Sequence, residues 1–201
     1  GAGNIAMEEV KRASPDGYTL ILGHVGTLAV NPALFGKKLP YDPNKDFAPV
    51  TLVAKVPNVI AVSEKSPYKT LADLVADAKK NPGKINYGSA GNGSAGHLAM
   101  EYLKLVTGTY ITHIPYRGGG PALNDVMAGQ VPLFFANVAS SLGHIQAGKL
   151  RALAVTSQVR ARSLPNVPTM AEAGVPGYEV LEWNPLLAPA GLAADVLPAR
   201  N

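Results

Sequence analysis

The sequence predicts an α/β protein in two lobes, each with a mainly parallel sheet flanked by helices. Hydrophobic residues make up 47% of the 201 residues and charged residues only 16%, which is the composition of a globular protein. From about residue 70 onward, short apolar segments alternate with segments of helical periodicity. The 21 glycines and 17 prolines stand between these segments, where they mark turns. Strands and helices that alternate at short spacing are typical of parallel sheets covered by helices.

The N-terminal third is expected to begin with a helix over residues 5–13. The turn SPDG then leads into the apolar segment YTLILG, residues 18–23, which predicts a buried strand. The segments expected next are a loop over residues 24–32 and two separate extended segments, residues 50–54 and 58–63. Because the first helix has no strand before it, we expect the natural protein to carry a further strand ahead of Gly1.

The middle of the chain has a regular rhythm that begins at Thr70. Thr70 is expected to cap a helix, because Asp73 stands three residues later in the pattern of a capping box. Asn81-Pro82-Gly83 should end that helix. The elements expected after it are, in order, a strand at 85–89, a helix at 95–106, a strand at 110–116, a helix at 121–128 that starts with Pro121, a strand at 131–136, a short helix at 141–147 and a strand at 150–156.

Two lobes are expected to share these elements. We assign residues 1–63 and 176–201 to the first lobe and residues 64–175 to the second. The chain should cross between the lobes in extended segments near residues 56–63 and 178–189.

Composition excludes several classes of function. The net charge is +4, but lysine and arginine never occur in runs longer than two and aromatic residues are only 6%, which argues against nucleic-acid binding. The absence of cysteine excludes disulfides, thiol catalysis and thiolate metal sites. No apolar run reaches the length of a membrane-spanning helix, and the first residues lack the features of a signal peptide. The four histidines lack metal-ligand spacing, so no metal site is expected.

The glycine-rich stretch YGSAGNGSAGH, residues 87–97, stands between a predicted strand and a predicted helix. At such a helix start, free backbone N–H groups and the positive end of the helix dipole favour an anion. Glycines allow a tight turn and a close approach of the ligand to the backbone. The predicted anion-binding residues of this turn are Ser89, Ala90, Gly91, Asn92, Gly93, Ser94 and Ala95.

The spacing Gly91-x-Gly93-x-x-Gly96 also matches a dinucleotide-binding turn. A phosphate loop would need a lysine after its last glycine, but Ser94 follows Gly93 here. A dinucleotide site would need an acidic residue about twenty positions later, and no Asp or Glu occurs between Glu101 and Asp125. Arg117 at the end of the next strand could accept a 2′-phosphate, so an NADP-dependent oxidoreductase remains an alternative.

Two neighbouring loops have the same character as the glycine-rich stretch. YRGGGP, residues 116–121, places Tyr116 and Gly118 after the next strand, and the strand after that is followed by Asn137, Ser140 and Ser141. Ligands of open α/β sheets bind at the carboxyl ends of the strands. Three loops rich in donors at one edge therefore favour a small, oxygen-rich solute.

Catalytic patterns are weak in this chain. His97 lies in the first turn of a predicted helix, where a capping or solvated role is favoured over catalysis. Neither Ser89 nor Ser94 has the glycine spacing of a nucleophile elbow. The carboxylates stand mostly beside lysines on predicted helices, as on a solvated face. No enzymatic activity and no cofactor are expected.

Several blocks, in order, resemble the substrate-binding receptors of tripartite tricarboxylate transporters, the Bug-type proteins. They are DGYTL, YDP with FAPV, YGSAGNGSAGH, PYRGGGPALNDVMAGQV, GKLRALAVTS and LPNVPTMAEAGVPGY, and they cover nearly the whole chain. This chain departs from the family at Trp183-Asn184-Pro185-Leu186, where members tend to have Trp-x-Gly-Leu. From the resemblance, we expect the family's first strand and its glycine-rich loop to precede Gly1, and further helices to follow Asn201.

The resemblance implies a periplasmic-binding-protein-like (type II) fold with a ligand cleft between two lobes. It implies a receptor in the periplasm that binds a small carboxylate, such as a di- or tricarboxylate, an aromatic acid or an amino acid, and delivers it to a membrane permease. The residues it places at the ligand are the turn from Ser89 to Ala95, the loop from His24 to Thr27, and Asn137. A monomer is expected, and a signalling receptor that senses the same solutes is the second alternative.

Overall fold

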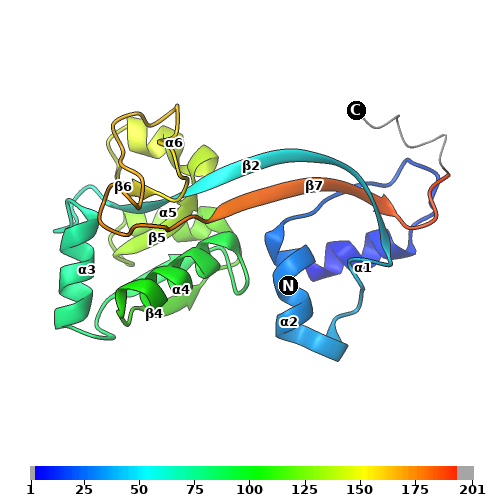
Figure 1. Ribbon diagram of the computed structural model, residues 1–201, viewed down its shortest axis with the longest axis horizontal. Coiled ribbons are helices and arrows are strands. Elements are labelled where there is room, and N and C mark those ends of the chain that lie inside the picture. Colours follow the sequence, from blue (N-terminus) through cyan, green and yellow to red (C-terminus); the bar gives the residue numbers. More distant parts are fainter. Residues whose placement is uncertain (1–2, 194–201) are drawn as a thin grey trace. The chain divides into compact units, whose positions relative to one another are not determined.

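The computed structural model describes residues 3–193, in which short helices and strands alternate (Figure 1). The elements are α1 Asn4–Arg12, β1 Ile21–Leu22, η1 Gly26–Val30, α2 Asn31–Phe35, η2 Gly36–Lys38, β2 Phe47–Ser63, α3 Leu71–Lys80, β3 Asn86–Ser89, α4 Ala95–Thr107, β4 Thr112–Pro115, α5 Gly119–Met127, β5 Leu133–Asn137, α6 Val138–Gln146, β6 Leu150–Val155 and β7 Leu181–Pro189. No helix in this described part is long and apolar enough to cross a lipid bilayer. The predicted α/β class is confirmed.

Two compact units divide the chain. Within residues 3–193, the first unit comprises residues 3–55 and 182–193, and the second comprises residues 56–181. The expected boundaries lay at 63/64 and 175/176; the second unit is larger because the end of β2 pairs inside its sheet. The last eight residues of the expected first lobe, 194–201, lie outside the described residues.

β2 and β7 connect the two units and lie side by side (Figure 1). The sequence predicted two extended segments, at 50–54 and 58–63, whereas β2 is one strand of 17 residues. Pro49 and Pro57 lie within β2 without ending it. The expected crossings therefore correspond to continuous strands.

The sheet of the second unit is mixed. β3 runs parallel to β4 and β5, as the alternation of strands and helices predicted. β2 runs antiparallel to β5 along one edge and to β6 along the other. The parallel part places the carboxyl ends of β3, β4 and β5 at one edge, which we call the carboxyl edge.

Helices cover both faces of this sheet. Buried residues of α3 and α4 form one hydrophobic cluster with Ile60, Val62, Leu133 and Phe135. Buried residues of α5 form a second cluster with the alternate residues of the same strands, among them Val59, Ala61, Phe134 and Ala136, and Val138 of α6 joins it. This period of two assigns each strand side chain to one face.

The predicted helix signals are confirmed, but two helices of the second unit start earlier than expected. α6 begins at Val138, three residues before the expected start at 141. Thr70 and Asp73 form the full capping box of α3, and Gly108 ends α4 in a left-handed conformation. Pro121 was expected to be the first helical residue, but α5 begins two residues earlier at Gly119. Proline fits there because the first turn of a helix needs no N–H from it.

The first unit corrects two further expectations. The segment 18–23 is not a buried strand: β1 has only two residues, and Tyr18 is 94% exposed. Within the described residues, β1 pairs only with β7 and is an edge strand. Residues 26–35 are helical where a loop was expected, because tertiary bonds hold them: the Tyr41 hydroxyl donates to the Thr27 carbonyl at 2.7 Å.

Gly96 brings α4 against β5. A Cβ on Gly96 would lie 2.4 Å from the carbonyl oxygen of Phe135, so only glycine fits this contact without displacing backbone. The contact fixes the start of α4 beside the carboxyl edge.

We expect Gly96→Ala to lower the free energy of unfolding by about 1–3 kcal/mol, because α4 must move off β5. The measurement is urea unfolding followed by circular dichroism. Gly143→Ala is the matched control: it lies inside α6 with nothing within 4 Å of an added Cβ, and should stabilise by about 0.5–1 kcal/mol. Equal effects of the two substitutions would contradict the contact.

Candidate functional site

Two of the predicted turns join at the carboxyl edge. Tyr116 N–H donates to the Ser89 carbonyl at 3.0 Å, and Gly118 N–H donates to the Ala90 carbonyl at 3.1 Å. The turn after β3 and the turn after β4 are thereby held together by their backbones. The N–H group of Gly118, one of the predicted ligand donors, is occupied in this contact.

The glycine turn, defined as residues 89–96, is held by its own side chains. Ser89 Oγ accepts the Gly91 N–H at 3.1 Å, and His97 Nδ1 accepts the Gly93 N–H at 3.1 Å. Gly91 and Gly93 have φ angles of 131° and 76°, which favour glycine. Two N–H groups that the sequence suggested for an anion are therefore already engaged inside the turn.

Two backbone N–H groups remain at the start of α4. Ser94 caps this helix: its hydroxyl accepts from His97 N–H and its carbonyl from Leu98 N–H. Across residues 3–193, no hydrogen bond uses the N–H groups of Ala95 or Gly96, the first two residues of the helix. This pair, at the positive end of a 13-residue helix, can bind a small anion. A pyrophosphate would also need the N–H groups of Gly91 and Gly93, which are already hydrogen-bonded inside the turn.

An aromatic stack connects the turn to the sheet. The ring centroids of Tyr87 and His113 are 4.8 Å apart, and those of His113 and His97 are 4.2 Å apart. Ser89 Oγ lies 2.6 Å from His113 Nε2. His97 and His113 therefore hold the two bonded ends of the glycine turn, so the expected capping role of His97 is confirmed.

Both imidazoles favour the neutral form. Burial lowers the pKa of His113 to about 4; His97 and Lys104 act in the same direction, while Glu101 opposes them. Burial also lowers the pKa of His97, again against the charge of Glu101. Glu101 is occupied by Lys104 and by the Tyr87 hydroxyl, both at 2.8 Å. A neutral His97 can accept the Gly93 N–H through Nδ1, whereas a protonated ring could not.

The short distance between Ser89 and His113 is that of a nucleophile and its base. Ser89 Oγ is, however, already bonded inside the turn, to the Gly91 N–H at 3.1 Å and to the Gly91 carbonyl at 3.2 Å. The contact positions the turn instead. Within residues 3–193, no group of three or more acidic or histidine side chains is arranged to hold a metal ion.

Tyr116 and the polar residues at and after the end of β5 also make hydrogen bonds within the second unit. The Tyr116 hydroxyl donates to Asp125 at 2.7 Å, and burial together with this bond raises the pKa of Tyr116 to about 12. Asn137 caps α6, because its Oδ1 accepts the Ala139 N–H at 2.9 Å. The hydroxyls of Ser140 and Ser141 donate back to the Asn137 carbonyl at 2.9 and 3.0 Å.

His24 and Thr27 lie in the first unit and bond to each other. His24 N–H donates to Thr27 Oγ1 at 3.1 Å, and this hydroxyl donates to the His24 carbonyl at 3.0 Å. His24 Nδ1 also accepts the Gly26 N–H at 3.0 Å. Burial lowers the pKa of His24, opposed by the charge of Glu182. These residues form a rigid helix entry.

The sequence analysis missed one residue at the carboxyl edge, Asn58. It is 2% exposed, and its Nδ2 has no hydrogen-bond acceptor among the described residues. β2 places it opposite Asn137 of β5. A polar residue inside the apolar run VPNVIAV was the signal that could have found it.

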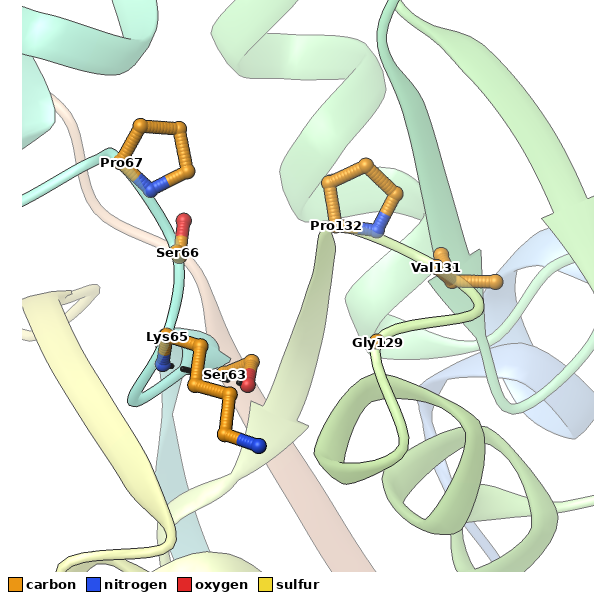
Figure 2. A pocket seen from close by; sticks show the side chains of 7 residues that line it. All are labelled: Ser63, Lys65, Ser66, Pro67, Gly129, Val131 and Pro132. Carbon is orange, nitrogen blue, oxygen red and sulfur yellow. Dashed lines mark hydrogen bonds between the residues drawn. The ribbon is translucent and has the colours of Figure 1, made fainter.

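A cavity of about 340 Å³ lies at the opposite edge of the sheet (Figure 2). Ser63, Lys65, Ser66 and Pro67, which follow or end β2, face Gly129, Val131 and Pro132, which precede β5. Because the carboxyl ends of β3 and β5 lie at the other edge, this cavity is separate from the glycine turn.

We expect the free energy of unfolding to fall as the pH falls from about 6.5 to about 4. In this window the unfolded chain protonates His113 while the folded chain keeps it neutral, and the loss should be on the order of 2 kcal/mol for a partly exposed ring. His113→Phe retains a stacked ring without the titration, so its stability should fall less over the same window. Urea unfolding at half-unit pH steps measures both, and equal slopes would contradict the assignment.

Comparisons with known proteins identify the family of this chain and proteins of similar fold. Residues 1–199 match the family described as tripartite tricarboxylate transporter family receptor. BugT of Bordetella pertussis is 37% identical over 203 residues, covering 100% of this chain and 62% of BugT. Two solved structures are similar to this chain, each with a TM-score of 0.93. A periplasmic transporter is 49% identical, and Rpa4515 of R. palustris with adipate is 41% identical. Each alignment covers 98% of this chain and 66% of the other chain. The chain thus spans less than two thirds of each of these proteins. It belongs to the receptor family of the tripartite tricarboxylate transporters.

Proposed function

We propose that the protein containing this chain is a periplasmic receptor that binds a small carboxylate and delivers it, unchanged, to a membrane permease. The family and the similar periplasmic transporter support the receptor role and the compartment. The similar structure that holds adipate supports a dicarboxylate within the wider class of di- and tricarboxylates, aromatic acids and amino acids. We further infer that the receptor is a monomer without a cofactor. A signalling receptor that senses the same solutes would bind them in the same way.

The single observation that carries the proposal is the pair of available N–H groups of Ala95 and Gly96. A carboxylate has two oxygens that can accept both bonds, and the helix dipole adds to the attraction. In this proposal the other predicted site residues shape the unit in which they lie and do not donate to the carboxylate at the start of α4. They are His24 and Thr27 in the first unit, and Tyr116, Gly118 and Asn137 in the second.

The first expected result is direct binding. Isothermal titration of the complete protein with C4 to C6 dicarboxylates should give dissociation constants near or below about 10 μM, because a few charge-assisted hydrogen bonds suffice for such affinity. NADPH should not bind at millimolar concentration, since the Gly91 and Gly93 donors are engaged. Saturable NADPH binding that Arg117→Ala weakens would instead favour the oxidoreductase.

Ala95→Pro tests the helix start. Proline removes the N–H group at the first helical position, where its ring is tolerated, and Ser94 already has the extended conformation that a residue before proline needs. We expect adipate affinity to fall by about 10-fold or more. Ala95→Ser retains the N–H group and should bind like the wild-type protein. Unchanged affinity in Ala95→Pro would exclude this anion site.

A further inference from the structure

Asn58 carries a buried amide with unused bonding capacity. Its main chain is satisfied by Thr156: the Asn58 N–H donates to Thr156 Oγ1 at 2.9 Å, and the Asn58 carbonyl accepts the Thr156 N–H at 2.9 Å. Its side chain is different, because Nδ2 finds no acceptor among the described residues although Asn58 is only 2% exposed. A buried donor without an acceptor opposes folding, so leucine would be the more stable choice here.

The alternation of β2 places this side chain on the face that α4 covers. Ile60 and Val62 belong to the hydrophobic cluster of α3 and α4, while Val59 and Ala61 belong to the cluster of α5 and α6. Asn58 is two residues before Ile60 and therefore shares its face.

The pairing of β2 with β5 places the same side chain at the start of α4. Ile60 lies opposite Phe135, and Asn58 lies opposite Asn137 at the carboxyl end of β5. Gly96 is packed on the Phe135 carbonyl, two residue pairs along β5 from Asn137. The unpartnered Nδ2 and the unpartnered N–H groups of Ala95 and Gly96 thus occupy one face at one edge of the sheet.

We propose that Asn58 Nδ2 is a third donor to the carboxylate that binds at the start of α4. This inference rests on the proposed receptor function and adds a residue to its site. The resulting donor set is neutral: two backbone N–H groups and one amide, beside two imidazoles whose pKa values burial lowers. Such a set selects an anionic acceptor with two close oxygens, which is the chemistry of a carboxylate.

The test compares folding and binding in the same variants of the complete protein, with adipate as the probe. Asn58→Leu should leave the melting temperature of the unliganded protein unchanged or raise it, and should weaken adipate binding by 10-fold or more. Asn58→Asp carries acceptors only and should abolish measurable binding. Thr156→Val is the matched control: it removes the neighbouring hydroxyl, should lower the melting temperature, and should leave adipate affinity within about 3-fold.

A second measurement keeps the inference testable if Asn58→Leu folds poorly. In the 15N-labelled protein, the Asn58 side-chain NH₂ resonances should shift when adipate is added. Wild-type affinity in Asn58→Leu, or resonances that do not move at saturation, would overturn the role of Asn58. A wild-type protein that binds no carboxylate would instead overturn the proposed function, and loss of affinity in Ala95→Pro alone would leave that function standing without Asn58.

Discussion

The candidate site depends on the distance at which α4 meets β5. Gly96 lets the first turn of this helix approach the Phe135 carbonyl to a distance that a Cβ would not permit. This contact places the N–H groups of Ala95 and Gly96 at the carboxyl edge, next to the strand that carries Asn137. A helix start elsewhere on the sheet would have the same dipole, but it would not have the same neighbours.

The polar groups around the glycine turn separate into two sets. The first set consists of N–H groups that bond to the side chains of Ser89, His97 and Ser94. These bonds hold the shape of the glycine turn and of the helix start. The N–H groups of Ala95 and Gly96 are left over for a ligand in the proposed function. Burial lowers the pKa of both imidazoles, and the neutral form lets His97 Nδ1 accept the Gly93 N–H.

β2, the strand that carries Asn58, runs from one unit into the other. The strand belongs to the first unit up to Lys55 and to the second unit from Val56, so Asn58 stands three residues beyond the change. A ligand contact at Asn58 would therefore act on one of the two strands that connect the units. The antiparallel entry of β2 beside β5 also makes the sheet mixed, which places Asn58 opposite Asn137.

Sequence patterns were enough to predict the α/β class, most helix and strand positions of the second unit, and the glycine turn at a helix start. These features depend on local signals: the Thr70–Asp73 capping box, Gly108 after α4, and the alternation of apolar segments with glycines. The predictions were wrong at residues 18–35, because burial and helix formation in this segment depend on partners such as Tyr41. The hydrogen bonds of the backbone N–H groups, in contrast, could be seen only in the folded chain. Gly93 bonds His97 within one turn, but His113 reaches Ser89 from another strand, and Asn58 reaches the carboxyl edge only through its register with β5. Such contacts join residues far apart in the chain, and their formation depends on packing, which no local spacing records.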